Sequence, residues 1–208
     1  MFIERVPTPV RALYPRGRFR MDPQERKVYL TFDDGPIPEA TPEILDILAR
    51  EDVKATFFMV GDNVRKYPEI ARRVIDEGHA VGNHTFHHIK ALGMGTASYR
   101  LDVVQASGLI PSRLFRPPHG WLWSRQWRVL RREGFRLVYY DLVTRDYSRR
   151  MDARGVVENV RRYARPGSII VFHDSLKSIG KLRTALPESI RWLKEEGYSF
   201  GLLTADNV

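Results

Sequence analysis

The sequence predicts an α/β protein in which a parallel sheet closes into a barrel. Short apolar runs alternate with amphipathic segments from residue 27 to the end, which is the pattern of parallel strands joined by helices. Seven such units occur in a chain of 208 residues, and a small barrel needs about this many strands to close. We therefore predict a single domain over residues 27–208, preceded by an irregular arm over residues 1–26.

The expected strands are the apolar runs. They cover residues 27–32, 55–60, 79–82, 114–116, 136–141, 168–173 and 199–203. Two helices are predicted to begin at Thr41-Pro42 and at Pro68, where proline suits the first helical turn. Further helices are expected over 124–133, 152–164 and 187–196, each followed by glycine or proline. The pattern over 94–110 is weaker, because glycines interrupt it.

The charge balance is strongly basic. A net charge of +9 and a pI near 10 favour anionic partners such as nucleic acid, a membrane surface or an acidic glycan. Most Arg-Arg pairs fall on predicted helices, where we interpret them as solvated faces, and we expect no nucleic-acid partner. The arm is expected to pack along the barrel without supplying catalytic groups, with its arginines mostly exposed. Its apolar side chains are Phe2, Ile3, Val6, Val10, Leu13, Tyr14 and Phe19, and its arginines are Arg5, Arg11, Arg16, Arg18 and Arg20.

Composition excludes several classes of site. The chain has no cysteine, so it forms no disulfide, and any metal must be held by histidine and carboxylate ligands. No run is long enough to span a bilayer, and the first residues lack the apolar core of a secretory signal. We expect a monomer in the cytoplasm, or in the cell envelope if a leader was removed or another export route is used.

The most informative stretch is Thr31-Phe32-Asp33-Asp34-Gly35-Pro36, which closes the first apolar run. Two adjacent carboxylates at a strand end point in different directions, because the backbone there leaves its extended form. One can then bind a metal while its neighbour acts as a base. Gly35 permits a sharp turn, and Pro36 fixes the exit of the chain. Taken alone, the hexapeptide is also compatible with a plain acidic turn.

Polar clusters also follow later strands. His84 and His88 are four residues apart, and we expect both to project from one side of a single helical turn toward one ion. The intervening His87 is interpreted as a packing or supporting residue, and His79 as structural. The other clusters are Arg116-Pro117-Pro118-His119-Gly120, Asp146, and His173-Asp174. Because the carboxyl ends of parallel strands open onto one face of a barrel, these clusters are expected to form one site.

These motifs make the chain resemble the polysaccharide deacetylase family, carbohydrate esterase family four, over about residues 27–203. The resemblance rests on Thr-Phe-Asp-Asp-Gly-Pro at 31–36, Lys-Ala-Thr-Phe-Phe at 54–58, His-Thr-x-x-His at 84–88, Arg-Pro-Pro-x-Gly at 116–120 and apolar-x-His at 171–173. It implies a deformed (β/α)7 barrel with a NodB-homology domain. The implied activity is metal-dependent removal of N-acetyl groups from an N-acetylglucosamine glycan, such as peptidoglycan or a chitin-like oligomer.

The resemblance also implies a ligand set. Asp34, His84 and His88 would bind one divalent ion, with zinc the best match and cobalt, nickel or manganese as alternatives. That ion would lower the pKa of a water molecule and polarise the acetyl carbonyl.

Catalytic roles follow from the same resemblance. Asp33 would be the general base, held by Arg116 at the rim of the pocket. His173 would be the general acid, oriented and favoured in its charged form by Asp146. The backbone N–H of His119 would stabilise the oxyanion.

The chain departs from the family pattern at several positions. His119 stands where tyrosine is usual, and Val143 replaces the first aspartate of the fourth motif. Tyr147 replaces tryptophan and Val171 replaces leucine; both would line the pocket for the acetyl methyl group, so they bear on acyl specificity. Trp121 is a candidate platform for sugar stacking, and Trp123 is a weaker one.

Two alternatives remain open from the sequence. The same site could act on O-acetyl groups of a glycan such as xylan, or on a non-sugar amide. A catalytically silent barrel could instead bind an anionic polymer through its basic surface. The intact set Asp33, Asp34, His84, His88 and His173 argues against this second alternative.

Overall fold

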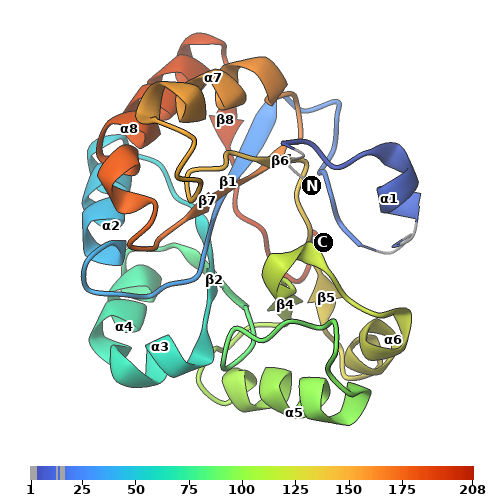
Figure 1. The fold of residues 1–208 in the computed structure, drawn as a ribbon. Helices are drawn as coiled ribbons and strands as arrows, with labels where there is room; N and C mark the ends of the chain where they lie inside the picture. The colour runs from blue at the N-terminus through green and yellow to red at the C-terminus, as the bar shows by residue number, and fades with distance from the viewer. Residues whose placement is uncertain (1–3, 13, 15–16) are drawn as a thin grey trace.

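The computed structural model describes residues 4–12, 14 and 17–208, and it shows a curled parallel sheet with helices on its outside (Figure 1). The strands are β1 (Lys27–Asp33), β2 (Thr56–Met59), β3 (Ala80–Asn83), β4 (Leu114–Phe115), β5 (Arg136–Leu137), β6 (Leu142–Val143), β7 (Ile169–His173) and β8 (Ser199–Phe200). Their order is β5-β4-β3-β2-β1-β7-β6, and β8 pairs with the start of β1. All named pairs are parallel. The predicted class, a deformed α/β barrel, is confirmed.

The helices occupy the segments between the strands. They are α1 (Thr8–Ala12), α2 (Thr41–Arg50), α3 (Gly61–Lys66), α4 (Pro68–Asp76), α5 (Thr96–Ser107), α6 (Ser124–Arg132), α7 (Ala153–Tyr163) and α8 (Ile179–Glu195). Proline lies in the first turn of both α2 and α4, as predicted. The segment that glycines interrupt forms α5. Its buried Tyr99 and Val103 belong to a core cluster that includes residues of β4 and β5.

The last helix differs from the prediction. We expected it to begin at Pro187, but α8 begins at Ile179 and carries Pro187 in its interior. Its buried apolar residues continue on one side through both halves, including Leu182, Leu186 and Ile190. Burying these side chains stabilises the helix by more than the hydrogen bond that the proline removes, since each buried aliphatic side chain contributes about 1.5–3 kcal/mol.

The predicted fifth strand, 136–141, is not continuous. Only its first two residues form β5, and the next strand, β6, begins just after it at Leu142; β5 and β6 lie at opposite edges of the sheet. The arm fills the space between these edges: Arg18 forms a parallel bridge with Val138, and Arg5 an antiparallel bridge with Leu142. Figure 1 shows α1 of the arm at the right of the view, above α6. The arm therefore covers the gap that the strands leave open.

A buried carboxylate holds the arm in place. Asp141 is fully buried and accepts hydrogen bonds from Arg11 (2.5 Å), from Ser168 (2.8 Å) and from both the Nε and Nη2 of Arg165 (2.8 and 2.6 Å). Arg5 lies 3.7 Å from the same carboxylate. Because a buried charge needs such partners, the pairing ties the arm to the chain between β5 and β6.

The expectation of mostly exposed arm arginines is therefore only half right. Arg5 and Arg18 are exposed, whereas Arg11 and Arg20 are half-buried, and Arg20 donates to the Pro166 carbonyl. Aromatic packing also attaches the arm, since the buried Phe19 stacks on Tyr139 with ring centroids 4.6 Å apart. Predictions that concern Phe2, Ile3, Leu13, Arg16 and the side chain of Val10 fall outside the described residues.

The main core lies between the sheet and the helices α2, α7 and α8. Phe32 sits at its centre and stacks on Phe57 and Phe172 from the two neighbouring strands. In the described part of the chain, no helix combines the length and the apolar character needed to cross a membrane. The packed core fixes the carboxyl ends of β1 and β7, where Asp33-Asp34 and His173-Asp174 lie; the other polar clusters follow β3, β4 and β6.

Candidate active site

The acidic turn after β1 is fixed by a carboxylate from the strand beside it. Asp34 has a φ of 91°, in the left-handed region, so its side chain departs from the direction of Asp33. Asp174, directly after β7, accepts hydrogen bonds from the Gly35 amide (2.9 Å) and from the Thr41 hydroxyl (2.7 Å). A Cβ on Gly35 would lie 1.8 Å from an Asp174 oxygen, so only glycine fits this close approach.

Asp34, His84 and His88 converge on one point. One ligand atom from each lies within 4.8 Å of the others, and no second group of this kind occurs among the residues that the structure describes. Asp34 Oδ1 is 3.1 Å from His88 Nε2 and 3.8 Å from His84 Nε2. The predicted ligand triad is therefore assembled in space.

The protonation of the triad suits a cation. His84 Nδ1 lies 2.8 Å from the Arg116 carbonyl, which can only accept, so this nitrogen carries the proton and Nε2 keeps its lone pair. Burial lowers the pKa of His84 to about 4, which keeps the ring neutral. Burial acts to raise the pKa of Asp34, but the hydrogen bond from His88 and the charge of His173 hold it below its usual range. Two imidazoles and one carboxylate make a donor set that fits a divalent first-row ion.

The expectation of a helical turn over 84–88 is wrong. The segment has no helix, and Thr85 and His88 have φ values of 66° and 53°. Asp102 of α5 holds this turn, accepting hydrogen bonds from the amides of Phe86 (2.7 Å) and His87 (3.1 Å). Non-helical backbone at these positions brings the two rings to a centroid separation of 5.1 Å.

The two other histidines lie outside the triad. His87 is exposed, and its Nδ1 pairs with Asp102 at 2.6 Å, so it supports the turn. His79 is buried and accepts a hydrogen bond from the Ala55 amide, which fits its structural interpretation.

Arg116 lies beneath Asp33 rather than at the rim, where the sequence analysis places it. The residue is 1% exposed; Nη1 donates to Asp33 Oδ1 (2.6 Å) and to the Thr31 hydroxyl (2.8 Å). Nη2 donates to the Tyr139 carbonyl, and the Phe58 ring lies 4.0 Å from the guanidinium carbon. The buried charge is stable here because Asp33 neutralises it and the strands supply further acceptors.

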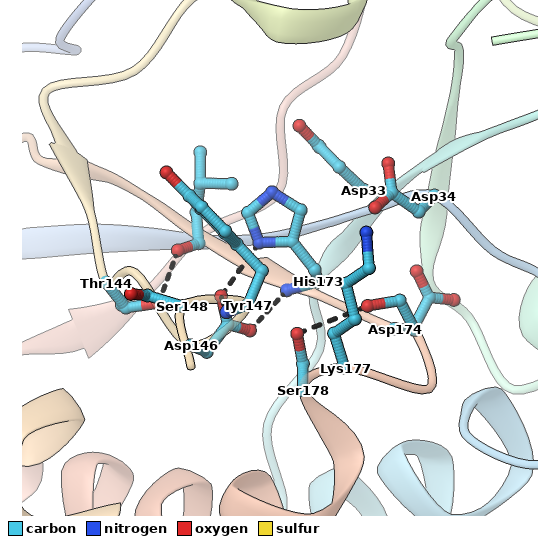
Figure 2. A network of polar contacts seen from close by, with 12 residues as sticks. Asp33, Asp34, Thr144, Asp146, Tyr147, Ser148, His173, Asp174, Lys177 and Ser178 are labelled. Carbon is cyan, nitrogen blue, oxygen red and sulfur yellow. Dashed lines mark hydrogen bonds and ion pairs between the residues drawn. The ribbon is translucent and has the colours of Figure 1, made fainter. Parts of the chain in front are cut away.

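His173 and Asp146 form a second acid–base pair at the end of β7 (Figure 2). Asp146 Oδ1 accepts from His173 Nδ1 at 2.8 Å, and its Oδ2 accepts from the His173 amide at 2.7 Å. Burial alone would lower the pKa of His173, but the charge and hydrogen bond of Asp146 raise it to about 9. The imidazole is therefore protonated at neutral pH, and Nε2 is the nitrogen turned away from Asp146.

These groups line one pocket of about 310 Å³. Its lining includes both aspartates of the turn, the histidine pair, Arg116, His173 and the predicted residues His119, Val143, Tyr147 and Val171. Tyr147 packs edge-on against the His173 ring, with centroids 4.9 Å apart. Trp121 and Trp123 are 48% and 55% exposed and do not line this pocket, so the structure does not bring them to the reacting groups.

Four residues that shape the site received no role from the sequence, although Asp174 was placed in one of the polar clusters. Tyr140 and Lys177 line the pocket, and Asp174 and Asp102 hold its two turns. The Lys177 side chain has no hydrogen-bond or ion-pair partner in the described part of the chain, and Figure 2 shows it extending toward the side where Asp33 and Asp34 lie. A positive charge four residues after a candidate acid histidine was the available signal for Lys177.

The comparisons with known proteins agree with this site. A family model described as polysaccharide deacetylase matches residues 20–138. A peptidoglycan-N-acetylglucosamine deacetylase of Bacillus cereus is 34% identical over 183 residues, which cover 84% of this chain and 66% of that relative. A chitooligosaccharide deacetylase of Bradyrhizobium is 38% identical over 157 residues, covering 72% of this chain and 71% of the relative.

Solved structures show the same fold. A crystal structure of a peptidoglycan N-acetylglucosamine deacetylase superposes with a TM-score of 0.88 at 32% identity, covering 94% of this chain and 95% of that one. A pseudoenzyme of carbohydrate esterase family four from Bacillus anthracis has a TM-score of 0.80 at 27% identity, covering 89% and 66%. The fold and site define a hydrolase of the deacetylase class. The chain belongs to the polysaccharide deacetylase family.

Proposed function

We propose that this protein removes N-acetyl groups from a glycan that contains N-acetylglucosamine, using one divalent metal ion. The observation that carries the proposal is the convergence, in one pocket, of a possible ligand triad with the Arg116–Asp33 pair and the Asp146–His173 pair. The names of the two deacetylase relatives support an N-acetylated glycan as the substrate.

Asp34, His84 and His88 would hold the ion, with zinc the best match to this donor set. When bound, a divalent ion supplies a Lewis acid that polarises the acetyl carbonyl and favours deprotonation of water at neutral pH. The proton transfers are proposed for the side chains around the ion, Asp33 and His173.

Asp33 is proposed as the general base. Arg116 donates to Oδ1 only, and no described residue donates to Oδ2, so this second oxygen is free to accept a proton. The orientation of the carboxylate is set by Arg116, whose own position is fixed by Thr31 and the Tyr139 carbonyl. A base held in this way needs little reorganisation when it takes the proton.

His173 is proposed as the general acid. Its pKa of about 9 keeps a proton on Nε2 at neutral pH, and that proton can pass to the departing amine. Asp146 accepts from Nδ1 and so fixes both the ring orientation and the nitrogen that faces the pocket. Val171 and Tyr147 line the pocket beside this ring, where the acetyl methyl group is expected to lie.

Acetate release tests the proposal. The protein would be incubated with N-acetylglucosamine oligomers and with purified peptidoglycan, after removal of metal by a chelator and again after addition of zinc or cobalt. We expect release only with metal, and loss of release in His88→Gln. His79→Gln serves as the matched control, because His79 is a buried histidine that lines no part of the catalytic pocket.

The outcomes separate the alternatives. Release from acetylated xylan but not from the N-acetylated glycans would assign an O-acetyl substrate. Metal binding without release from any acetylated glycan would favour the silent barrel, a state that the pseudoenzyme relative shows to be compatible with this fold. Release that is unaffected by the chelator and by His88→Gln would contradict the proposed use of a metal.

A further inference from the structure

A row of arginines without acidic partners in the described part of the chain runs along α6 and continues beyond it. Arg125, Arg128, Arg131 and Arg132 belong to the helix, and Arg136 begins β5; all five are exposed. We call these five residues the α6 arginine track. None of their side chains has a hydrogen bond or ion pair with any residue that the structure describes. The helix itself contains no acidic residue, and Glu133, just after it, is paired with Arg100.

Other basic helices of the protein are arranged differently. Arg73 of α4 pairs with Asp46 and Glu77, and Arg161 of α7 lies close to Glu158 and Glu188. Such pairs balance charge on a solvated helix face. The track lacks this balance, so the interpretation of the Arg-Arg pairs as solvated faces does not account for α6.

Helix stability does not explain the track either. Arg131 and Arg132 lie in the last turn, where positive charge is favourable, but Arg125 lies in the first turn, where it is unfavourable. Arginines spaced three and four residues apart, such as Arg125, Arg128 and Arg132, also repel one another on the helix surface. An arrangement that opposes the stability of its own helix indicates a binding role.

The track ends in a cavity that adds further binding groups. This cavity, of about 550 Å³, is lined by Arg131, Arg132, Arg136, the arm residue Arg18 and the half-buried indole of Trp127. The side chain of Arg18 likewise has no partner in the described ranges. Arg136 begins β5, so the cavity lies at the amino-terminal end of that strand, whereas the catalytic pocket lies at the carboxyl ends.

We propose that the α6 arginine track and this cavity bind a linear polyanion with repeating phosphate groups. Arginines from three segments line one cavity, and a tetrahedral phosphate offers oxygens in several directions, whereas a carboxylate offers two in one plane. Every cation of the track is arginine rather than lysine, which suits forked contacts with phosphate. The spacing of about one helical turn, about 5.4 Å, lets one extended chain contact successive arginines. The site is separate from the catalytic pocket and can hold a polymer while a glycan is processed.

A triple variant tests this site. Inorganic polyphosphate is titrated into the wild-type protein and into Arg125→Gln/Arg128→Gln/Arg132→Gln, at several salt concentrations. We expect binding to weaken at least tenfold in the variant, and the slope of log K against log salt to fall by about two to three. The matched control is Arg72→Gln/Arg154→Gln/Arg191→Gln, which removes the same charge from three exposed arginines on α4, α7 and α8.

The proposal is supported if the track variant loses binding and the control does not, while both keep the thermal midpoint and the wild-type acetate release on a neutral oligosaccharide. Equal weakening in both variants would overturn it, because net charge alone would then explain binding. If poly-glutamate binds as tightly as polyphosphate, the assignment to phosphate is overturned. If duplex DNA binds more tightly than polyphosphate, the assignment to a flexible linear polymer is overturned. The polyphosphate titration and the thermal midpoint do not depend on whether the catalytic proposal holds.

Discussion

Replacing Asp146 with asparagine should change the pH dependence of turnover more than any other single property. Asp146 is not proposed to react with the substrate. Its charge and hydrogen bond hold the pKa of His173 at about 9 rather than 6.5. A difference of this size corresponds to about 3 kcal/mol between the two protonation states. Asparagine keeps the shape and can still bond to Nδ1, but it removes the attraction to the charged ring.

The general acid must be protonated to act, so turnover is lost as pH rises through the pKa of His173. In Asp146→Asn, burial continues to lower that pKa and the main opposing charge is gone. The alkaline limb of kcat should then move to lower pH by about two units. A bound cation would lower the pKa in wild type and variant alike, so the difference between the two profiles is the informative quantity.

The assay is acetate release from a neutral N-acetylglucosamine oligomer between pH 5 and 10 with metal in excess. Asp76→Asn on α4 is the control, because Asp76 is exposed and has no ion pair in the described part of the chain. An unshifted alkaline limb in Asp146→Asn would refute the assignment of His173 as the acid that Asp146 sustains.

The same pair predicts a pH dependence of folding stability. The folded pKa of His173 is raised above the unfolded value, so its contribution is complete below about pH 6.5 and is lost as pH rises through about 9. Urea unfolding of wild type should show this loss between these values. Asp146→Asn should show little change over that interval.

Three further predictions concern the groups around this pair. Asp33→Asn should abolish acetate release while calorimetry still shows metal binding, because the change removes a proton acceptor but none of the three candidate ligands; retained release would contradict the base assignment. Arg116→Ala should lower the free energy of unfolding by about 3–5 kcal/mol, since it leaves the buried Asp33 carboxylate without its partner, and an unchanged urea midpoint would contradict this. Asp141→Asn should destabilise by a similar amount, because Arg11 and Arg165 lose a fully buried counter-charge; Asp22→Asn in the exposed turn is the control for this urea experiment.

The sequence was sufficient to locate the site because topology places it. The carboxyl ends of parallel strands meet at one face, so Asp33 at the end of β1, Arg116 after β4 and His173 at the end of β7 had to lie near one another. The hydrogen bond between Asp146 and His173 was expected from the family resemblance, and the structure places Asp146 after β6 and His173 at the end of its neighbour β7. These predictions depend on which strand each residue follows and are insensitive to local backbone detail.

Local backbone conformation was not predictable in the same way. A spacing of four residues is compatible with a helical turn, but the turn from His84 to His88 instead depends on two left-handed residues and on Asp102, which comes from the following helix. The burial of Arg116 could not be predicted either. It depends on the Phe58 ring and the Tyr139 carbonyl, and the position of an arginine after a strand does not indicate these contacts. In both cases the deciding partner is distant in sequence.

The arm shows how such distant partners connect the fold to the site. No described arm residue lines the catalytic pocket, in keeping with the expectation that the arm supplies no catalytic group. Its Glu4 nevertheless accepts hydrogen bonds from the Val143 amide through its carbonyl and from Arg145 through its carboxylate. Arg145 has a φ of 62° and directly precedes Asp146. Because β6 is an edge strand of only two residues, these contacts restrain the segment that carries Val143, Asp146 and Tyr147, and the arm thereby helps to set the wall beside His173.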